Sequence, residues 1–274
     1  WIIGWDLILE YLFAASTVSV GWSGYVVSFL KDFNINVPPQ FSDATGTVLV
    51  NIPELGWKPL HAFAHTLAES GINADALPHV TCILNLPAMF IIALLSTLLV
   101  IGIKESANFN NLMVIIKVSV IVLFIAVGFA FVKSVNWHPF IPANKVESTP
   151  ISEYGSFWLW LKAYGSEFGK FGISGILRGA GVIFFAYIGF DAVSTAAQEA
   201  RNPQRDMPVG ILGSLGISTL LYILVAVVMT GIVSYKTLNV ADPVAVAVDA
   251  MGKGMFWLRP IVKIAAIAGL SSVI

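Results

Sequence analysis

The sequence predicts an all-α protein that crosses a membrane several times, and three observations carry this prediction. Charged residues make up only 11% of the chain, against about 25% in soluble domains. The mean hydropathy is +0.83. The apolar residues also gather in long runs, close to the roughly 20 residues that a helix needs to span a bilayer. A chain of 274 residues could not cover a soluble surface with so few charges.

Six segments are apolar enough to predict transmembrane helices, and we expect them at about 3–30, 80–103, 112–132, 172–197, 209–235 and 256–274. Since lipid offers the backbone no hydrogen-bond partner, these spans are expected to form one helical bundle. Residues 1–274 then make up a single transmembrane domain. The chain starts at Trp1 and ends inside an apolar run, so we expect this domain to be partial, from the interior of a longer protein.

The connections between the spans alternate between long and short. Residues 31–79 and 133–171 form long loops rich in proline, whereas 104–111 and 198–208 are short. Two crossings separate one long loop from the next, so all long loops share one side of the membrane. Lys104, Arg201 and Arg205 lie in the short loops, which the positive-inside rule therefore places in the cytoplasm. We expect a multi-pass protein of the cell membrane with long outer loops.

Composition also excludes several classes of function. The net charge is −1, so no basic surface for nucleic acid is expected. A single cysteine, Cys82, excludes an internal disulfide framework and a cysteine-based metal cluster. His61 and His65 are four residues apart but lack the HExxH pattern, so we interpret them as a loop feature. Neither a metal ion nor another cofactor is expected.

Ionisable residues inside the predicted spans are candidate functional residues, because a charge in lipid is costly. Glu10 lies one turn after Asp6 on the same helix face, and it either pairs with a cation on a neighbouring helix or lies on a substrate pathway. Lys117 is the only charge in the third span. It either reaches the cytoplasmic interface with its long stem or is a buried ammonium that can release its proton. The residues alone leave both pairs of alternatives open.

The fourth span contains two glycine features. Gly175 and Gly179 form a GxxxG pattern, which is typical of closely packed helices. Gly189 is followed by Asp191 in an otherwise apolar run, which suits either a broken helix that exposes backbone groups to a substrate or a continuous helix that uses glycine for packing. If the helix is broken, regular helical hydrogen bonding should be lost between about Phe185 and Asp191.

Three longer motifs are specific: FFAYIGFDAVST with EARNPQRDMP at 184–208, GWDLILEY at 4–11, and KESANFNN at 104–111. They resemble, respectively, the sixth helix and following loop, the third helix, and the loop between helices four and five of bacterial cationic amino acid transporters. These belong to the amino acid–polyamine–organocation superfamily. The resemblance runs in order along nearly the whole chain, and only the long outer loops depart from it. It implies the LeuT-type inverted-repeat transporter fold, with the six spans as helices three to eight.

The resemblance implies a substrate site as well. Phe185, Ala186 and Ile188 would lie at the unwound part of helix six, where their carbonyls take the substrate amino group. The Phe185 ring would close over the substrate, and Asp191 would hold the break. Glu10 would face the pocket and favour a cationic side chain.

The resemblance also implies which residues couple transport to an ion. Lys117 matches a helix-five lysine that fills the place of a sodium ion in sodium-coupled relatives, and Ser271 and Ser272 would be its neighbours on helix eight. A fixed ammonium there argues for proton coupling. The expected function is a proton-coupled secondary amino acid transporter that works by alternating access, with amino acids and the proton as its ligands. Cationic and neutral amino acids are both open as substrates.

Two other classes of function were weighed against the transporter. A helical channel or receptor should show a repeated pore segment or a charged ring, and the sequence contains neither. An intramembrane enzyme should show paired catalytic groups, but the one conceivable pair, Asp6 and Asp191, lies in no supporting motif. The chain is therefore expected not to be an enzyme.

Overall fold

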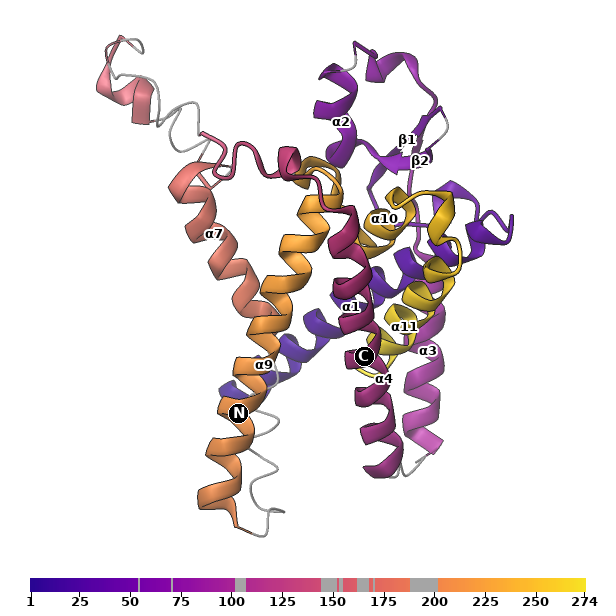
Figure 1. Cartoon of the computed structure of the whole chain (residues 1–274), viewed down its shortest axis with the longest axis vertical. Helices are drawn as coiled ribbons and strands as arrows, with labels where there is room; N and C mark the ends of the chain where they lie inside the picture. The colour runs from indigo at the N-terminus through magenta and orange to yellow at the C-terminus, as the bar shows by residue number, and fades with distance from the viewer. Residues whose placement is uncertain are drawn as a thin grey trace. The chain divides into compact units, whose positions relative to one another are not determined.

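The computed structural model describes residues 1–53, 55–69, 71–101, 107–143, 152, 155–161, 168–169, 171–187 and 202–274. Its contacts divide the chain into two compact units, one formed by 1–136 together with 224–274 and the other by 137–223. Helices dominate the described residues (Figure 1). The predicted class is confirmed as a mostly helical protein with several apolar helices, although a small sheet makes the term all-α too strict.

Three helices in the described part of the chain are long and apolar enough to cross a membrane, at Ile2–Asp32, Val114–Phe131 and Pro203–Ile232. They correspond to α1 (Ile2–Asp32), α4 (Ala107–Gly128) with the 3₁₀ turn that follows it, and α9 (Pro203–Ile232). The shorter apolar helices are α3 (Leu86–Ile101) and α7 (Gly172–Phe184). Large apolar side chains are exposed on α3, as they are on helices that lipid surrounds.

Two helix starts differ from the sequence-based expectation. The helix expected from residue 80 begins at Leu86, because Val80 lies in a strand and Asn85 caps the helix by accepting the N–H of Ala88 at 3.1 Å. The helix expected from residue 256 is α11 (Leu258–Ser271). A further short helix, α10 (Pro243–Ala250), precedes it and was not anticipated.

Residues 31–79, expected to be a long polar loop, contain a small folded element. Strands β1 (Val48–Ile52), β2 (Gly56–Pro59) and β3 (His79–Thr81) form an antiparallel sheet in the order β2-β1-β3. Helix α2 (Leu60–Glu69) follows β2 directly. An apolar cluster joins this helix to the sheet and is made of Val50, Ile52, Ala62, Phe63 and Leu67. The loop therefore has a small core of its own.

The main core of the first unit lies between α4, α10, α11 and the end of α9. Its buried members are Phe124, Val228, Ile232, Ala247, Val248, Met251, Leu258 and Val262. Burying each of the larger side chains contributes about 1.5–3 kcal/mol. Gly128 permits this packing, since a Cβ atom at that position would lie 2.6 Å from Cγ1 of Val228. Helix α11 lies between α1 and α4, a position that decides the arrangement of the candidate site (Figure 1).

Candidate functional site

Lys117 on α4 contacts the C-terminal end of α11. Its Nζ donates a hydrogen bond to Oγ of Ser272, and the Ser272 hydroxyl in turn donates to the Gly269 carbonyl at 3.1 Å. Gly269 faces the lysine stem, since a Cβ there would lie 3.8 Å from Cγ and Cε of Lys117. The stem of Lys117 thus packs against the backbone of α11 at Gly269, and its ammonium is hydrogen-bonded to the Ser272 hydroxyl. Ser272 is its only hydrogen-bond partner in the described residues.

The preceding serine points to a different helix. Oγ of Ser271 accepts a hydrogen bond from the indole Nε1 of Trp22 at 2.8 Å and donates to the carbonyl of Ile267 at 2.8 Å. Trp22 is a buried side chain of α1. Successive residues of a helix point about 100° apart, so Ser271 faces α1 while Ser272 faces α4. The structure therefore brings Lys117 and Ser272 together and places Ser271 beside them.

Glu10 is not brought to this cluster. It lies on α1, is partly exposed, and makes no hydrogen bond or ion pair within the described residues. Its helix neighbours Ile8, Leu12 and Phe13 are exposed apolar side chains. This half of α1 is therefore a largely apolar surface that carries two carboxylates, those of Asp6 and Glu10.

The segment that holds the other predicted substrate residues changes its hydrogen bonding where the sequence suggested. The α-helix α7 ends at Phe184, and residues Phe185–Tyr187 continue as a 3₁₀ turn. The hydroxyl of Tyr187 is 2.9 Å from Oγ1 of Thr219 on α9, within the second unit. Ala186 is exposed. The Phe185 side chain, together with the whole of Ile188 and Asp191, lies outside the described residues.

The two glycines of the GxxxG pattern, Gly175 and Gly179, lie on α7. The space beside Gly179 is open, with no described atom within 4 Å of a Cβ built there.

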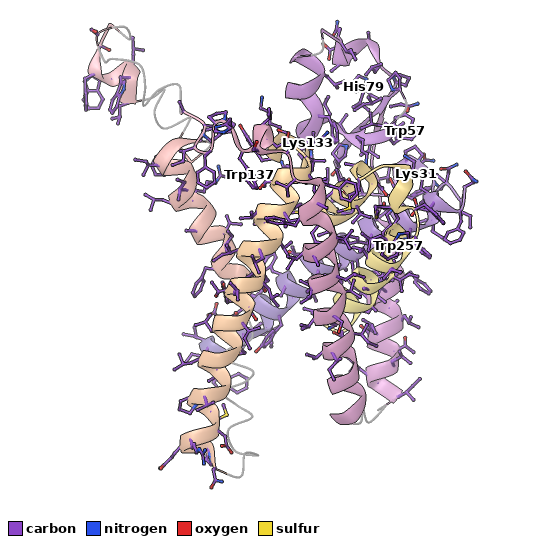
Figure 2. The ribbon with its side chains drawn as sticks, in the orientation of Figure 1. Lys31, Trp57, His79, Lys133, Trp137 and Trp257 are labelled. Carbon is purple, nitrogen blue, oxygen red and sulfur yellow. The ribbon has the colours of Figure 1, made fainter. Side chains whose placement is uncertain are left out.

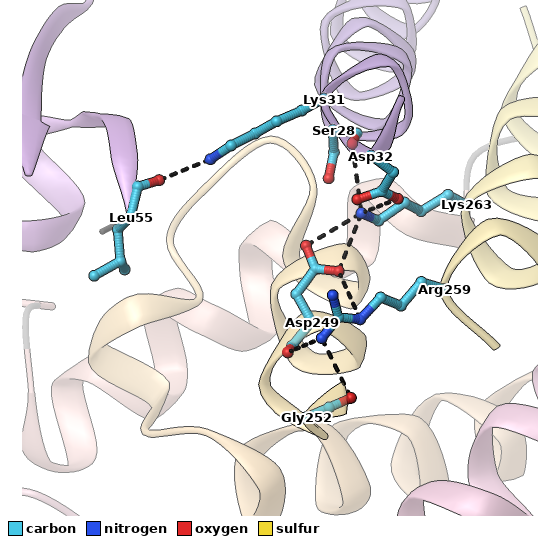
Figure 3. A network of polar contacts seen from close by, with 8 residues as sticks. All are labelled: Ser28, Lys31, Asp32, Leu55, Asp249, Gly252, Arg259 and Lys263. Carbon is cyan, nitrogen blue, oxygen red and sulfur yellow. Dashed lines mark hydrogen bonds and ion pairs between the residues drawn. The ribbon is translucent and has the colours of Figure 1, made fainter. Parts of the chain in front are cut away.

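A buried ion-pair network was missed by the sequence analysis, although it lies on the same helix as the two serines (Figure 3). Lys263 of α11 is fully buried. Its Nζ is 2.8 Å from Oδ2 of Asp32, 3.1 Å from the carboxylate of Asp249, and 3.4 Å from the Ser28 carbonyl. Arg259 supports Asp249 by donating to its backbone carbonyl at 3.0 Å. The network ties together the end of α1, α10 and the start of α11.

Sequence spacing could not reveal this network, because Lys263 and Asp32 are 231 residues apart. The only signal was that Arg259 and Lys263 are two cations in an otherwise apolar helix. Such charges are normally paired when they are buried.

Comparison with known proteins gives consistent results over the whole chain. The family model described as amino acid permease matches residues 1–274. A methylthioribose transporter of Bacillus subtilis (strain 168) is 37% identical over 272 residues, which are 99% of this chain and 46% of that protein. The branched-chain amino acid permease BcaP of the same organism is 37% identical over 273 residues, again 99% of this chain and 46% of the relative.

A plant relative is similar over a shorter stretch. The chloroplastic cationic amino acid transporter 9 of Arabidopsis thaliana is 35% identical over 189 residues, which are 69% of this chain and 28% of that protein. The chain thus spans about half the length of the two bacterial relatives and less of the plant one.

Proposed function

Since the chain belongs to the amino acid permease family, we propose that it forms helices three to eight of a secondary amino acid transporter with the LeuT-type inverted-repeat fold. The transporter lies in the cell membrane as a multi-pass protein, with the short loops 104–111 and 198–208 in the cytoplasm. Two observations support this: the three described helices that are long enough to span a bilayer, and the order in which the three sequence motifs occur. Transport proceeds by alternating access.

The proposed cargo is an amino acid, with cationic and neutral side chains both accepted. The names of the relatives support amino acids of both kinds, branched-chain for the bacterial permease and cationic for the plant transporter. The proposed site lies at the turn after α7, where Phe185, Ala186 and Ile188 offer backbone carbonyls to the substrate amino group. Asp191 holds the break and Glu10 faces the substrate side chain. The end of α-helical bonding at Phe184, inside an apolar segment, supports this position.

The contact between Lys117 and Ser272 is the single observation that carries the proposal most directly. The ammonium of Lys117 lies where the apolar helices α4 and α11 meet. Its partner is the Ser272 hydroxyl, and no carboxylate pairs with it in the described residues. A charge in that position is energetically costly, so its presence indicates a function. We assign to Lys117, Ser271 and Ser272 the coupling of transport to the proton.

The coupling follows from the geometry of that joint. Alternating access requires helices to move against one another, and a shift of α11 along α4 would remove the Ser272 hydroxyl from the ammonium. The two conformations would then bind the lysine proton with different affinity. A proton that is bound in one state and released in the other ties the conformational change to the proton gradient, because coupling between two ligands is reciprocal.

Uptake of labelled amino acids by the whole protein in liposomes tests this function. The account predicts uptake of at least one amino acid, and accumulation that rises when the outside is made more acidic than the inside. Uptake that ignores the pH gradient would contradict proton coupling. If no amino acid enters liposomes that hold folded protein, the proposed transport function is wrong.

The role of Glu10 is tested by substrate selectivity. Glu10→Gln should weaken uptake of lysine or arginine by about 1–3 kcal/mol relative to alanine, as expected for the loss of a charge-assisted hydrogen bond. Asp6→Asn, one turn earlier on the same helix, is the matched control and should leave selectivity unchanged. An equal loss for all substrates would assign Glu10 a structural role instead.

A further inference from the structure

A cavity of about 110 Å³ lies in the first unit, and none of the proposed substrate or coupling residues lines it. Its walls come from the last turns of α1, the β1–β2 hairpin and the segment that leads into α10. Lys31 of α1 and Trp57 of β2 are among the lining residues, and their positions can be followed in Figure 2. The walls are mixed, since apolar side chains such as Val27 and Leu49 lie beside several charged ones.

Two of the charged lining residues already have partners. Nζ of Lys31 donates to the Leu55 carbonyl at 2.9 Å, and the carboxylate of Asp249 is paired with Lys263 (Figure 3). A third, Asp43, accepts the N–H of Ala44 at 2.7 Å with one oxygen. These contacts hold the side chains of Lys31, Asp249 and Asp43 in place in the cavity wall.

The other two lining charges have opposite sign and are left unpaired. Lys58 on β2 makes no hydrogen bond or ion pair within the described residues. The carboxylate of Asp242 interacts with its own backbone N–H and with no other hydrogen-bond donor in that part of the chain. The two charges influence one another, yet no ion pair within 4.0 Å joins them. A cation and an anion thus line one cavity without forming a direct ion pair with each other.

We propose that this cavity binds a small zwitterion, whose carboxylate pairs with Lys58 and whose ammonium pairs with Asp242. Such a molecule would satisfy both charges at once, which an anion or a cation alone could not do. That the zwitterion is an amino acid on its way to the transport site rests on the proposed function, whereas the cavity and its charges do not.

The size of the cavity limits the ligand. An apolar cavity of about 150 Å³ holds one benzene molecule, which has six heavy atoms, so 110 Å³ suits a ligand of about four to five heavy atoms. Glycine falls in this range, and alanine is slightly larger. The indole of Trp57 and the side chains of Val27 and Leu49 can cover a short aliphatic part, but a long side chain would have to project out of the cavity.

The protonation of Asp242 supports the same assignment. Burial raises the pKa of this carboxyl to about 6, and the Lys58 ammonium opposes the rise only in part. The other charged or titratable groups that interact with it are Lys31 and the Tyr25 hydroxyl of α1, Asp249 of α10 and Lys263 of α11. A ligand ammonium would favour the ionised carboxylate, so binding should weaken as the pH falls below about 6.

Hydrogen–deuterium exchange of the whole protein tests the inference, because it reads out this cavity separately from the transport site. Saturating glycine or alanine should slow amide exchange in segments 47–59 and 238–250. Acetate, which has the carboxylate alone, and methylamine, which has the ammonium alone, should not. Lys58→Met and Asp242→Asn should each raise the glycine concentration needed for half-maximal protection by about 10-fold or more.

Matched controls exclude a general effect of charge removal. Lys133→Met and Asp75→Asn each neutralise one charge outside the cavity and should leave the protection unchanged. If Asp242→Asn does not fold, Lys58→Met and the comparison of glycine with acetate and methylamine on the unmodified protein still decide the matter.

The inference is overturned if no zwitterion protects the two segments, if acetate or methylamine protects them as well as glycine, or if protection is unchanged in both variants. Its failure differs from that of the proposed function. Amino acid uptake without protection here would remove this site and leave the transporter intact. Protection without any uptake would keep a zwitterion site and refute transport.

Discussion

The two ends of α11 hold two lysines in opposite ways. Near the start of the helix, Lys263 is fully buried and pairs with two carboxylates, those of Asp32 and Asp249. At the other end, Lys117 reaches in from α4, is partly exposed, and has the Ser272 hydroxyl as its hydrogen-bond partner. Helix α11 thus joins its neighbours through ion pairs at one end and through the hydroxyls of Ser271 and Ser272 at the other.

The difference suggests two roles for a lysine at a helix joint, an anchor for Lys263 and, under the proposed function, a switch for Lys117. Lys263 forms ion pairs with two carboxylates, so this end of α11 should stay fixed to α1 and α10. A single hydroxyl stabilises the charge of Lys117 far less, and moving that hydroxyl leaves the ammonium without a partner. We expect α11 to move, if it moves during transport, at its Ser271–Ser272 end.

Removing the anchor should produce the largest effect on stability. Lys263→Met leaves the carboxylate of Asp32 without its cation and that of Asp249 with Arg259 alone, 3.7 Å away, at a cost of about 3–5 kcal/mol. Lys117→Met loses one hydrogen bond and should cost only about 0.5–1.5 kcal/mol. Melting of the purified protein in detergent measures both.

A rescue experiment sharpens this contrast. Adding Asp32→Asn to Lys263→Met removes one of the uncompensated charges and should restore part of the lost melting temperature. Equal destabilisation by Lys263→Met and Lys117→Met would show that the two ends of α11 do not differ as described.

Two glycines allow a smaller test of how the helices around this joint pack. Gly128→Ala places a methyl group 2.6 Å from Cγ1 of Val228, which should cost about 1–3 kcal/mol. Gly269→Ala places its methyl group 3.8 Å from the Lys117 stem, an ordinary contact, and should be neutral or slightly stabilising through helix propensity. Thermal melting of the two variants would contradict the packing described here if their order were reversed.

The smallest expected effect is a pH dependence at the unpaired carboxyl beside the anchor. The pKa of Asp242 is raised from 3.8 to about 6, mainly by burial, so the folded state holds this proton more tightly than the unfolded state. Its contribution to stability is therefore full below about pH 4 and is lost as the pH rises through about 6. Lys31, Lys58, Lys263, Asp249 and Tyr25 are the titratable groups that interact with it.

Asp242→Asn should remove this pH dependence. Between about pH 4 and 6 the free energy of unfolding of the unmodified protein should fall relative to that of the variant, by an amount on the order of 1 kcal/mol. The slopes of melting temperature against pH should differ accordingly. The comparison is made without added amino acid. Identical slopes would show that Asp242 has no raised pKa in the folded protein.

The sequence predicted the helical segments well where they are long and uniformly apolar, as at Ile2–Asp32 and Pro203–Ile232. It failed in residues 31–79, because strands of three to five residues such as Val48–Ile52 are too short for their periodicity to stand out. The end of α7 at Phe184 was close to the expected position, since Gly189 and Asp191 marked the region.

Contacts between distant parts of the chain were predictable only through the family resemblance. That resemblance named Ser272 as a neighbour of Lys117, and the structure joins the two. No sequence motif predicted the ion pair between Lys263 and Asp32. The two residues are 231 positions apart, and their contact depends on the packing of α1 against α11. The cavity beside Asp242 escaped prediction for the same reason.

Uptake by the Lys117→Arg variant tests the central claim most directly. Guanidinium keeps the charge and nearly the reach of lysine but does not give up its proton. Whole protein with Lys117→Arg or Lys117→Ala is placed in liposomes beside the unmodified protein, and labelled amino acid uptake is followed under an imposed pH gradient. The account predicts that both variants lose pH-driven accumulation while still binding substrate. Full pH-driven accumulation by the arginine variant would contradict the proton switch and would show that Lys117 is only an anchor.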